Sequence, residues 1–128
     1  MTNEELRELD AQVAQIVFGW TKRPSWDGTD WNGPWDGEHW LGPDGKKTKV
    51  EPPYFSSSWA GVGRLIDELH ERGVYLDYCT LPNGRWAVIN RYDDNDMGTS
   101  HESFFVAVCQ HAVYVVKRLI AERKYTYD

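Results

Sequence analysis

The chain has 128 residues, a typical length for one domain, and its formal net charge is −6 at pH 7. Non-specific DNA binding needs clustered Lys and Arg side chains that displace counterions from phosphates, so this charge argues against it. The sequence starts with polar residues and has no run approaching ~20 apolar residues, which predicts neither a signal peptide nor a membrane span. We therefore expect a cytoplasmic domain that does not bind membranes.

The first predicted element is a helix from Thr2 to Phe18. Thr2 and Glu5 have the spacing of a capping box, in which each side chain accepts a hydrogen bond from the other residue's backbone N–H. One face of this helix is apolar and consists of Leu6, Leu9, Val13, Ile16 and Val17. Gly19 is expected to end the helix, because glycine readily adopts the left-handed conformation found there.

A tryptophan-rich loop over residues 20–40 follows the helix. Over residues 21–37 we predict no regular structure, because Trp26, Trp31 and Trp35 each precede an Asx-Gly pair that turns the chain sharply. Two interpretations stay open. In the first, the rings pack together and hold in place a loop that lacks secondary structure. In the second, they form a binding surface, since tryptophan is frequent in interface hot spots and stacks on nucleobases.

A weak hairpin is predicted from Glu38 to Val50, with Pro43-Asp44-Gly45 as its turn. The lysines at positions 46, 47 and 49 are typical of an edge strand that is protected from pairing with another chain. This hairpin would supply the first two strands of a small sheet.

The second helix is expected from Trp59 to Arg72, with Ser57 or Ser58 as its N-cap. Its predicted inner face consists of Trp59, Val62, Leu65, Ile66 and Leu69. Gly61 and Gly63 each cost about 1 kcal/mol relative to alanine inside a helix, so we interpret both as positions of close approach.

The central predicted element is a hairpin from Val74 to Arg91, joined by Leu81-Pro82-Asn83-Gly84. Proline fixes the first central φ of this turn, and the glycine can take the positive φ of a following bulge. The register places Tyr78 opposite Val88 and Thr80 opposite Trp86. The apolar face then carries Val74, Leu76, Tyr78, Trp86 and Val88, and the other face carries Tyr75, Asp77, Cys79, Arg85, Ala87, Ile89 and Arg91.

The acidic stretch from Tyr92 to Thr99 is predicted to be a solvated loop. Thr99 or Ser100 is expected to cap the last helix, whose apolar stripe consists of Phe104, Phe105, Val108, Ala112, Val115, Val116 and Leu119. The tail over residues 125–128 is expected to be loose. The whole predicts a single α+β domain over residues 1–128, in the order α-β-β-α-β-β-α, with a small antiparallel sheet of two hairpins layered with three helices.

Three patterns invite a cofactor, metal or catalytic interpretation, and their context argues against each. Gly61-Val62-Gly63 follows no strand and lacks the third glycine of a dinucleotide loop. Asp93-Asp94-Asn95-Asp96 is followed by a methionine where a calcium loop needs its fifth-position ligand. Cys109 and His111 are two residues apart on a helix and point to different sides. We expect Cys79 and Cys109 to be reduced and buried, and we predict no metal, no cofactor and no enzyme.

The less apolar face of the central hairpin offers two arginines for binding. Arg85 and Arg91 could hold a phosphate or a carboxylate through paired hydrogen bonds. In the plainer alternative, Arg91 pairs with Asp77 as a surface salt bridge. The candidate binding residues are Trp26, Trp31, Trp35, Arg85, Arg91 and Tyr92.

Three stretches of the sequence have counterparts in a known family. They are Leu9-Asp10-Ala11-Gln12-Val13-Ala14 with Val17-Phe18-Gly19-Trp20, then Pro52-Pro53-Tyr54-Phe55-Ser56-Ser57-Ser58-Trp59, and then Val106-Ala107-Val108-Cys109 after a two-strand ribbon. They resemble the phage ABA-sandwich proteins, which include the NinX-like proteins of tailed phages. The Trp-Asx-Gly stretch is not part of the family pattern. The resemblance implies a helix–sheet–helix layered fold, a phage or prophage origin and no catalytic residues.

We accordingly expect a non-enzymatic accessory protein that binds and modulates a host factor, such as a defence component, through the aromatic loop and the arginines. One alternative is a binder that sequesters a nucleotide signal, and a second is a small hydrolase or metal enzyme. A nucleotide needs a concave pocket where aromatic rings and arginines converge, whereas a protein target needs only a flatter exposed patch. A homo-oligomer is also possible.

Overall fold

The computed structural model describes residues 1–23, 39–45, 47–48 and 51–127. Trp26, Trp31 and Trp35 lie outside this described part, so their role stays a prediction. The described elements follow the order α1, β1, β2, β3, α2, β4, β5, β6, α3. The predicted α+β class is confirmed, and both predicted hairpins are present as antiparallel strand pairs.

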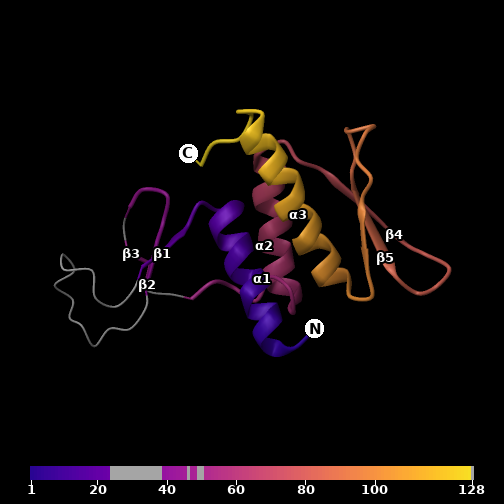
Figure 1. Cartoon of the computed structure of the whole chain (residues 1–128), viewed down its shortest axis with the longest axis horizontal. Coiled ribbons are helices and arrows are strands. Elements are labelled where there is room, and N and C mark those ends of the chain that lie inside the picture. The colour runs from indigo at the N-terminus through magenta and orange to yellow at the C-terminus, as the bar shows by residue number, and fades with distance from the viewer. Residues whose placement is uncertain (24–38, 46, 49–50, 128) are drawn as a thin grey trace.

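The three helices lie side by side and run in the same direction (Figure 1). They are α1 (Asn3–Ile16), α2 (Trp59–Glu71) and α3 (Phe104–Ala121). α3 packs against both other helices and also against β5 and β6. By length and composition α3 could cross a membrane, but half of it is buried inside the protein. Such burial is typical of a core helix.

Each helix begins at a hydroxyl N-cap that the structure identifies. At α1 the predicted capping box forms, because Thr2 Oγ1 accepts from the Glu5 N–H at 3.1 Å and Glu5 Oε1 accepts from the Thr2 N–H at 3.1 Å. Ser58 caps α2 as predicted. The cap of α3 is Ser103, not Thr99 or Ser100; the prediction was wrong because those two residues belong to a strand.

The first sheet is built from three short antiparallel strands in the order β1 (Thr21–Arg23), β2 (His39–Leu41) and β3 (Lys47–Thr48). Strand β1 corrects our prediction that no regular structure occurs over residues 21–37. Three residues are too few to show strand alternation, and the partner strand β2 is remote in sequence. The first sheet lies beside α1, on the opposite side of the helices from the second sheet (Figure 1).

The second sheet has the order β4 (Leu76–Thr80), β5 (Trp86–Asn90) and β6 (Thr99–His101). The predicted register is confirmed, since Tyr78 pairs with Val88 and Thr80 with Trp86. Gly84 in the turn has a φ of 83°, which is the positive value that its position required. β6 pairs antiparallel with β5 and was not predicted.

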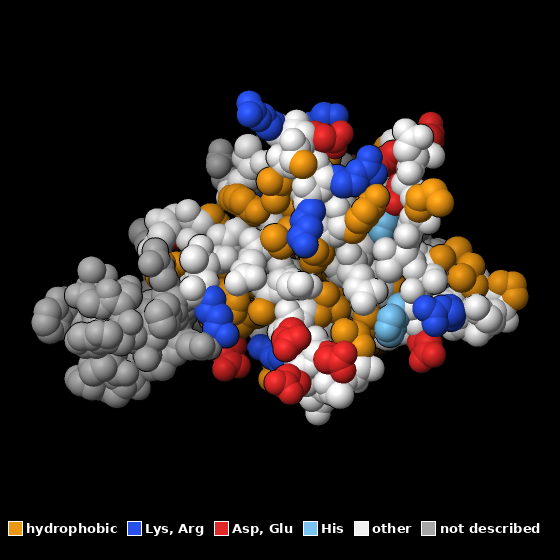
Figure 2. All heavy atoms as spheres, in the orientation of Figure 1, with side chains coloured by type: hydrophobic (Ala, Val, Ile, Leu, Met, Phe, Trp, Pro, Cys, Tyr) orange, Lys and Arg blue, Asp and Glu red, His pale blue; other side chains and the backbone are white. Residues whose placement is uncertain are grey.

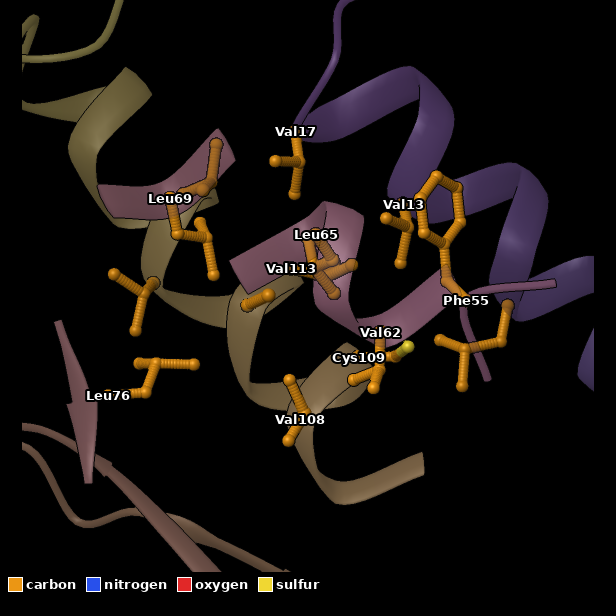
Figure 3. Close-up of a cluster of buried hydrophobic side chains, with 14 of the residues drawn as sticks. Val13, Val17, Phe55, Val62, Leu65, Leu69, Leu76, Val108, Cys109 and Val113 are labelled. Atoms are coloured by element: carbon orange, nitrogen blue, oxygen red, sulfur yellow. The ribbon is translucent and has the colours of Figure 1, made fainter. Parts of the chain in front are cut away.

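The hydrophobic core lies where the helices meet each other and the inner face of the second sheet. Figure 3 shows side chains from α1, α2, α3 and β4 converging there, together with Phe55 from the segment before α2. Among them, Val13, Val17, Val62, Leu65, Leu69 and Val108 are almost completely buried. The sequence predicted these positions from their helical spacing, and the structure confirms that they face the core.

Among the described elements, helices cover only one face of the second sheet. Ile89 on the other face is 43% exposed, and Cys79 is exposed as well. The expectation that both cysteines are buried was therefore wrong for Cys79, because its strand has no second layer above it. Figure 2 shows hydrophobic side chains gathered over the β4–β5 hairpin.

The C-terminal tail is docked, which corrects the expectation that residues 125–128 are loose. The Tyr125 hydroxyl donates to the Val17 carbonyl at 2.6 Å, and the Tyr127 hydroxyl donates to the Ile16 carbonyl at 2.8 Å. Carbonyls at a helix C-terminus lack partners within the helix, so the tail satisfies the end of α1. Asp128 lies outside the described residues.

Candidate functional site: an exposed aromatic cluster

Arg91 and Tyr92, two of the predicted binding residues, lie at one end of β5. The Nε and Nη2 atoms of Arg91 both lie 2.9 Å from Oδ1 of Asp77, which is the salt bridge considered as the plainer alternative. Both side chains are nearly half exposed, so solvent screens the pair and it contributes little to stability. Tyr92 is 73% exposed, and the Arg91 guanidinium lies 5.9 Å from the centre of its ring.

Arg85 lies at the opposite end of β5, where its Nη2 atom donates to the Ser100 carbonyl at 3.0 Å. The backbones of Arg85 and Arg91 are roughly 20 Å apart along the strand. The strands β1 and β2, which flank residues 24–38, lie on the far side of the helices (Figure 1). Arg85 and Arg91 therefore do not converge on one point. Trp26, Trp31 and Trp35 lie outside the described residues, so the combination of the arginines with the tryptophan loop stays a prediction.

The structure instead brings together five aromatic rings from four separate elements. We call Trp59, Tyr78, Trp86, Phe104 and Phe105 the aromatic cluster. Phe104, at the start of α3, is its centre, with ring centroids 5.3 Å from Tyr78, 5.1 Å from Trp86 and 5.6 Å from Trp59. Trp59 also meets Phe105 edge-on at 4.9 Å. The pairs Trp59–Phe105, Tyr78–Phe104 and Trp86–Phe104 are edge-to-face, an arrangement that stabilises aromatic pairs beyond the burial of their area.

Trp59 shows that this cluster reaches the surface, because 72% of its side chain is exposed. This corrects the prediction that Trp59 belongs to the inner face of α2. The buried stripe begins one turn later, at Val62, whereas Trp59 is the first residue of the helix and leans on the start of α3. Tyr78, in the middle of β4, is 36% exposed. One signal of this exposure was missed: the predicted cap at Ser58 places Trp59 at the open N-terminal end of its helix.

A hollow of about 580 Å³ runs along the exposed side of α2 from Trp59. It is lined by Phe18, Trp59, Ala60, Gly63, Arg64, Asp67, Glu68 and Glu71. The Arg64 guanidinium lies 5.6 Å from the Phe18 ring and 5.9 Å from the Trp20 ring. Glu68 forms an ion pair with Arg72 at 3.0 Å. The hollow thus has an aromatic end at Trp59 and an acidic end towards the C-terminus of α2.

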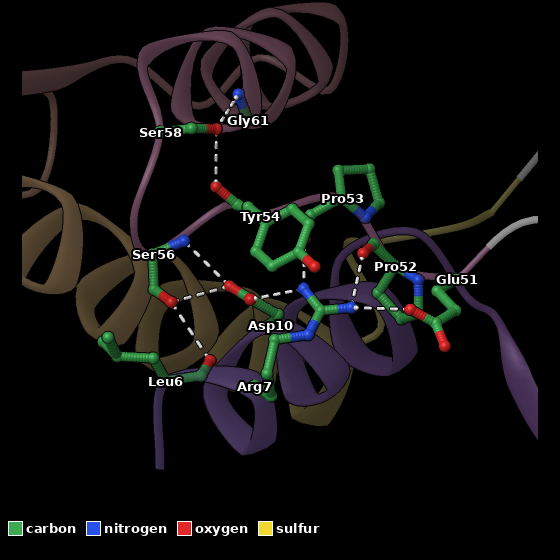
Figure 4. Close-up of polar contacts among 10 residues, drawn as sticks. All are labelled: Leu6, Arg7, Asp10, Glu51, Pro52, Pro53, Tyr54, Ser56, Ser58 and Gly61. Carbon is green, nitrogen blue, oxygen red and sulfur yellow. Dashed lines mark hydrogen bonds and ion pairs between the residues drawn. The ribbon is translucent and has the colours of Figure 1, made fainter. Parts of the chain in front are cut away.

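A buried carboxylate holds the segment before α2 on α1 (Figure 4). Oδ1 of Asp10 accepts from the Ser56 N–H at 2.8 Å and from the Ser56 hydroxyl at 2.7 Å, and Oδ2 accepts from Arg7 at 2.8 Å. Arg7 also donates to the carbonyls of Pro52 and Pro53. Because Asp10 has no exposed surface and its oxygens are used within the fold, we interpret this network as structural.

Arg7 also borders a smaller hollow of about 210 Å³ with Lys22 and Trp40. A nucleotide would need cationic donors here, but those of Arg7 are engaged by Asp10 and the proline carbonyls. The Trp40 ring offers little stacking surface, because its side chain is only 7% exposed. This hollow is therefore a poor match for a nucleotide phosphate and base.

A second buried network fixes the loop that we predicted to be solvated. Asp96 Oδ2 lies 2.6 Å from Nε2 of His111 and accepts from the Asn90 N–H at 2.6 Å, and Oδ1 accepts from the Gly98 N–H at 3.0 Å. The Thr99 hydroxyl lies 2.9 Å from Nδ1 of His111. Burial raises the pKa of Asp96, but the hydrogen bonds from Gly98, Asn90 and His111 outweigh it and hold that pKa below its ordinary value.

The Asp96, His111 and Thr99 side chains are arranged as an acid, a histidine and a hydroxyl, like the three residues of a catalytic triad. We interpret them as structural, because the Asp96 and His111 side chains are enclosed in the protein. The His111 side chain has no exposed surface, and both of its ring nitrogens are engaged inside the protein. Cys109, one helical turn from Phe105, is also fully buried, and burial raises the pKa of its thiol strongly. A thiol in that state is a poor nucleophile, because the thiolate is the reactive form.

No protein-family model, curated protein or solved structure matches this chain. The resemblance to the phage ABA-sandwich proteins accordingly stays a prediction. Within the described residues, no group of three or more His, Cys, Asp and Glu side chains could hold a metal ion.

Proposed function

We propose that this chain is a non-enzymatic binding protein whose recognition surface is centred on the aromatic cluster. The observation that carries the proposal is Trp59, which is 72% exposed while its ring packs on Phe104 and Phe105. Tryptophan and tyrosine are enriched among the residues that dominate interface energies. A rigid ring held in place by neighbours loses little conformational entropy on binding, so it is well suited to anchor a partner.

The partner in our proposal is a host protein, and the chain acts as a phage or prophage accessory protein that modulates a component of host defence. This part rests on the resemblance to the phage ABA-sandwich proteins, which implies a phage or prophage origin and no catalytic residues. Two features of the geometry support binding over catalysis. His111 and Cys109, the most conspicuous reactive side chains of α3, are fully buried, and the aromatic cluster is open to solvent.

Affinity capture from a lysate of the bacterial host tests this proposal with two variants. We expect the immobilised wild-type protein to retain a specific host protein, and Trp59→Ala to reduce the retained amount at least about tenfold, as for a hot-spot residue. Tyr92→Ala is the matched control, because Tyr92 is exposed to the same extent but lies outside the aromatic cluster. Melting temperatures of both variants check that the fold is intact.

Equal capture by wild type and Trp59→Ala would place the recognition surface elsewhere. Loss of capture in Tyr92→Ala alone would favour the end of β5 with Arg91. Mass spectrometry of small molecules released from the native protein tests the nucleotide alternative, and a bound nucleotide in place of a protein would replace our proposal.

A further inference from the structure

Gly63 occupies a position where the fold gives no reason for a glycine. At Gly61, two residues earlier in the same helix, an added Cβ would collide with the Tyr54 carbonyl, so the close approach of two backbones requires the glycine. At Gly63 an added Cβ would meet nothing within 4 Å. Glycine inside a helix is unfavourable relative to nearly every other residue. The empty space beside Gly63 belongs to the hollow along α2, with Ala60 as a second small residue in its floor.

The charges that line this hollow favour a cation. The Arg64 guanidinium lies over the Phe18 and Trp20 rings, on the side of the hollow that Phe18 lines. Glu68 is paired with Arg72. For Asp67 and Glu71 the described residues supply no ion pair or hydrogen bond. Both lie in the C-terminal half of α2, where the negative pole of the helix adds to the attraction for a positive charge.

The exposed Trp59 ring marks the other end of the same hollow. Trp59 and Asp67 are about 12 Å apart along the helix axis, or just over two turns. A helical segment of a partner could span this distance with an apolar side chain on the Trp59 ring and a Lys or Arg near Asp67 and Glu71. Small residues at the crossing point let two helices approach closely, and Ala60 and Gly63 lie between these two contacts.

We propose that the hollow along α2 docks a basic amphipathic helix of the partner protein, with Gly63 at the point of closest approach. This inference rests on the proposed function and names the chemistry of the partner. The net charge of −6 of the whole chain favours encounter with such a segment. The binding should weaken as salt rises, because the contacts at Asp67 and Glu71 are exposed and screened.

The test uses two fluorescein-labelled peptides of about four helical turns, one patterned with Leu and Lys and one with Glu in place of every Lys. Fluorescence anisotropy measures their binding to the full-length protein. We expect the lysine peptide to bind and the glutamate peptide not to bind. Gly63→Gln fills the hollow with a side chain that suits a helix, so we expect an unchanged or higher melting temperature and at least about tenfold weaker binding of the lysine peptide.

Charge variants separate the hollow from the overall charge of the protein. Asp67→Asn with Glu71→Gln should weaken binding about tenfold. Glu4→Gln with Glu8→Gln removes the same charge at the exposed start of α1, where acidic side chains gather in Figure 2, and should leave binding unchanged. Equal weakening by the two pairs, no effect of Gly63→Gln, or no binding of the lysine peptide to the wild-type protein would overturn the inference.

The same variants show which of the two proposals fails. If Trp59→Ala abolishes capture of the host protein and Gly63→Gln does not, the aromatic cluster binds the partner and the α2 hollow does not. If neither variant changes capture, both proposals are wrong. If both variants abolish capture and the lysine peptide competes with the captured protein, the basic-helix inference is supported.

Discussion

Asp96 and His111 fix an irregular loop and the edge strand β6 on α3. Their side chains are almost completely buried, and their atoms Oδ2 and Nε2 are 2.6 Å apart. The carboxylate also satisfies the backbone N–H groups of Asn90 and Gly98. A buried group with this many hydrogen bonds determines local structure, because leaving any of its partners unpaired costs free energy.

We predict that Asp96→Asn destabilises the protein by about 3 kcal/mol at pH 7, as expected when a buried carboxylate that accepts several hydrogen bonds is removed. The pKa of Asp96 is lowered by folding, so its contribution to stability is present above about pH 3.9 and is lost as the pH falls through the folded-state pKa. The difference in the free energy of unfolding between wild type and variant should therefore become smaller below about pH 4. Urea unfolding at several pH values measures it.

The control for this prediction is Asp93→Asn. Asp93 pairs with Arg118 at 3.2 Å, but both side chains are partly exposed, so its loss should cost less than about 1 kcal/mol. Equal losses in the two variants would mean that the network around His111 contributes no more than a surface ion pair.

The two cysteines should differ sharply in their reaction with a thiol reagent. Cys79 is exposed on the outer face of the second sheet, whereas Cys109 is buried and burial raises the pKa of its thiol. We expect the Cys79 thiol to react rapidly in the native protein and the Cys109 thiol to react only after unfolding. Cys79→Ser should abolish the fast phase, and Cys109→Ala should leave it unchanged. Two fast phases would show that α3 opens readily.

Helix α2 contains two glycines that serve different purposes. Gly61→Ala should destabilise the protein by about 1–3 kcal/mol, because its Cβ would push the Tyr54 carbonyl away from the helix. Gly63→Ala should stabilise it by about 1 kcal/mol, because the Cβ enters open space and alanine favours the helix. Thermal unfolding of both variants checks the opposite signs. A loss of stability in Gly63→Ala would show that Gly63 is needed by the fold itself.

The elements that the sequence predicted correctly are those whose determinants are local. Thr2 and Glu5 cap α1 through contacts three residues apart, and the turn at Gly84 sets the pairing of Tyr78 with Val88. The elements it missed depend on distant partners. β1 pairs with β2 across residues that carry no strand pattern, and β6 forms because β5 offers a free edge.

The candidate site was harder to predict than the fold for the same reason. Arg91 pairs with Asp77 as the hairpin register allowed, so its local environment was accessible from the sequence. The exposure of Trp59 could not be predicted from the sequence, because it depends on where the first turn of α2 meets the first turn of α3. Helical spacing alone placed Trp59 with the buried stripe of Val62, and only the tertiary arrangement separates them.

Across the whole molecule, the end of the chain closes the helix layer. Tyr125 comes after α3 and bonds Val17, 108 residues earlier in the sequence, at the end of α1. Arg72, at the end of α2, donates to the Thr126 carbonyl and lies 5.4 Å from the Tyr125 ring. The ends of all three parallel helices thus meet at the tail. Burial raises the pKa of Tyr125 above its ordinary value, so the hydroxyl stays a donor into the alkaline range.

We predict that Tyr125→Phe destabilises the protein by about 1–3 kcal/mol, because the change keeps the ring but leaves the buried Val17 carbonyl without its partner. Tyr127→Phe should cost less than about 1 kcal/mol, since Tyr127 is partly exposed and water can replace its hydroxyl at the Ile16 carbonyl. Urea unfolding with an unchanged m-value measures both. Truncation after Lys124 should lower the free energy of unfolding more than either substitution, because it also removes the packing of the Tyr125 ring on the core. A truncated protein as stable as the full chain would show that the tail does not hold the three helix ends together.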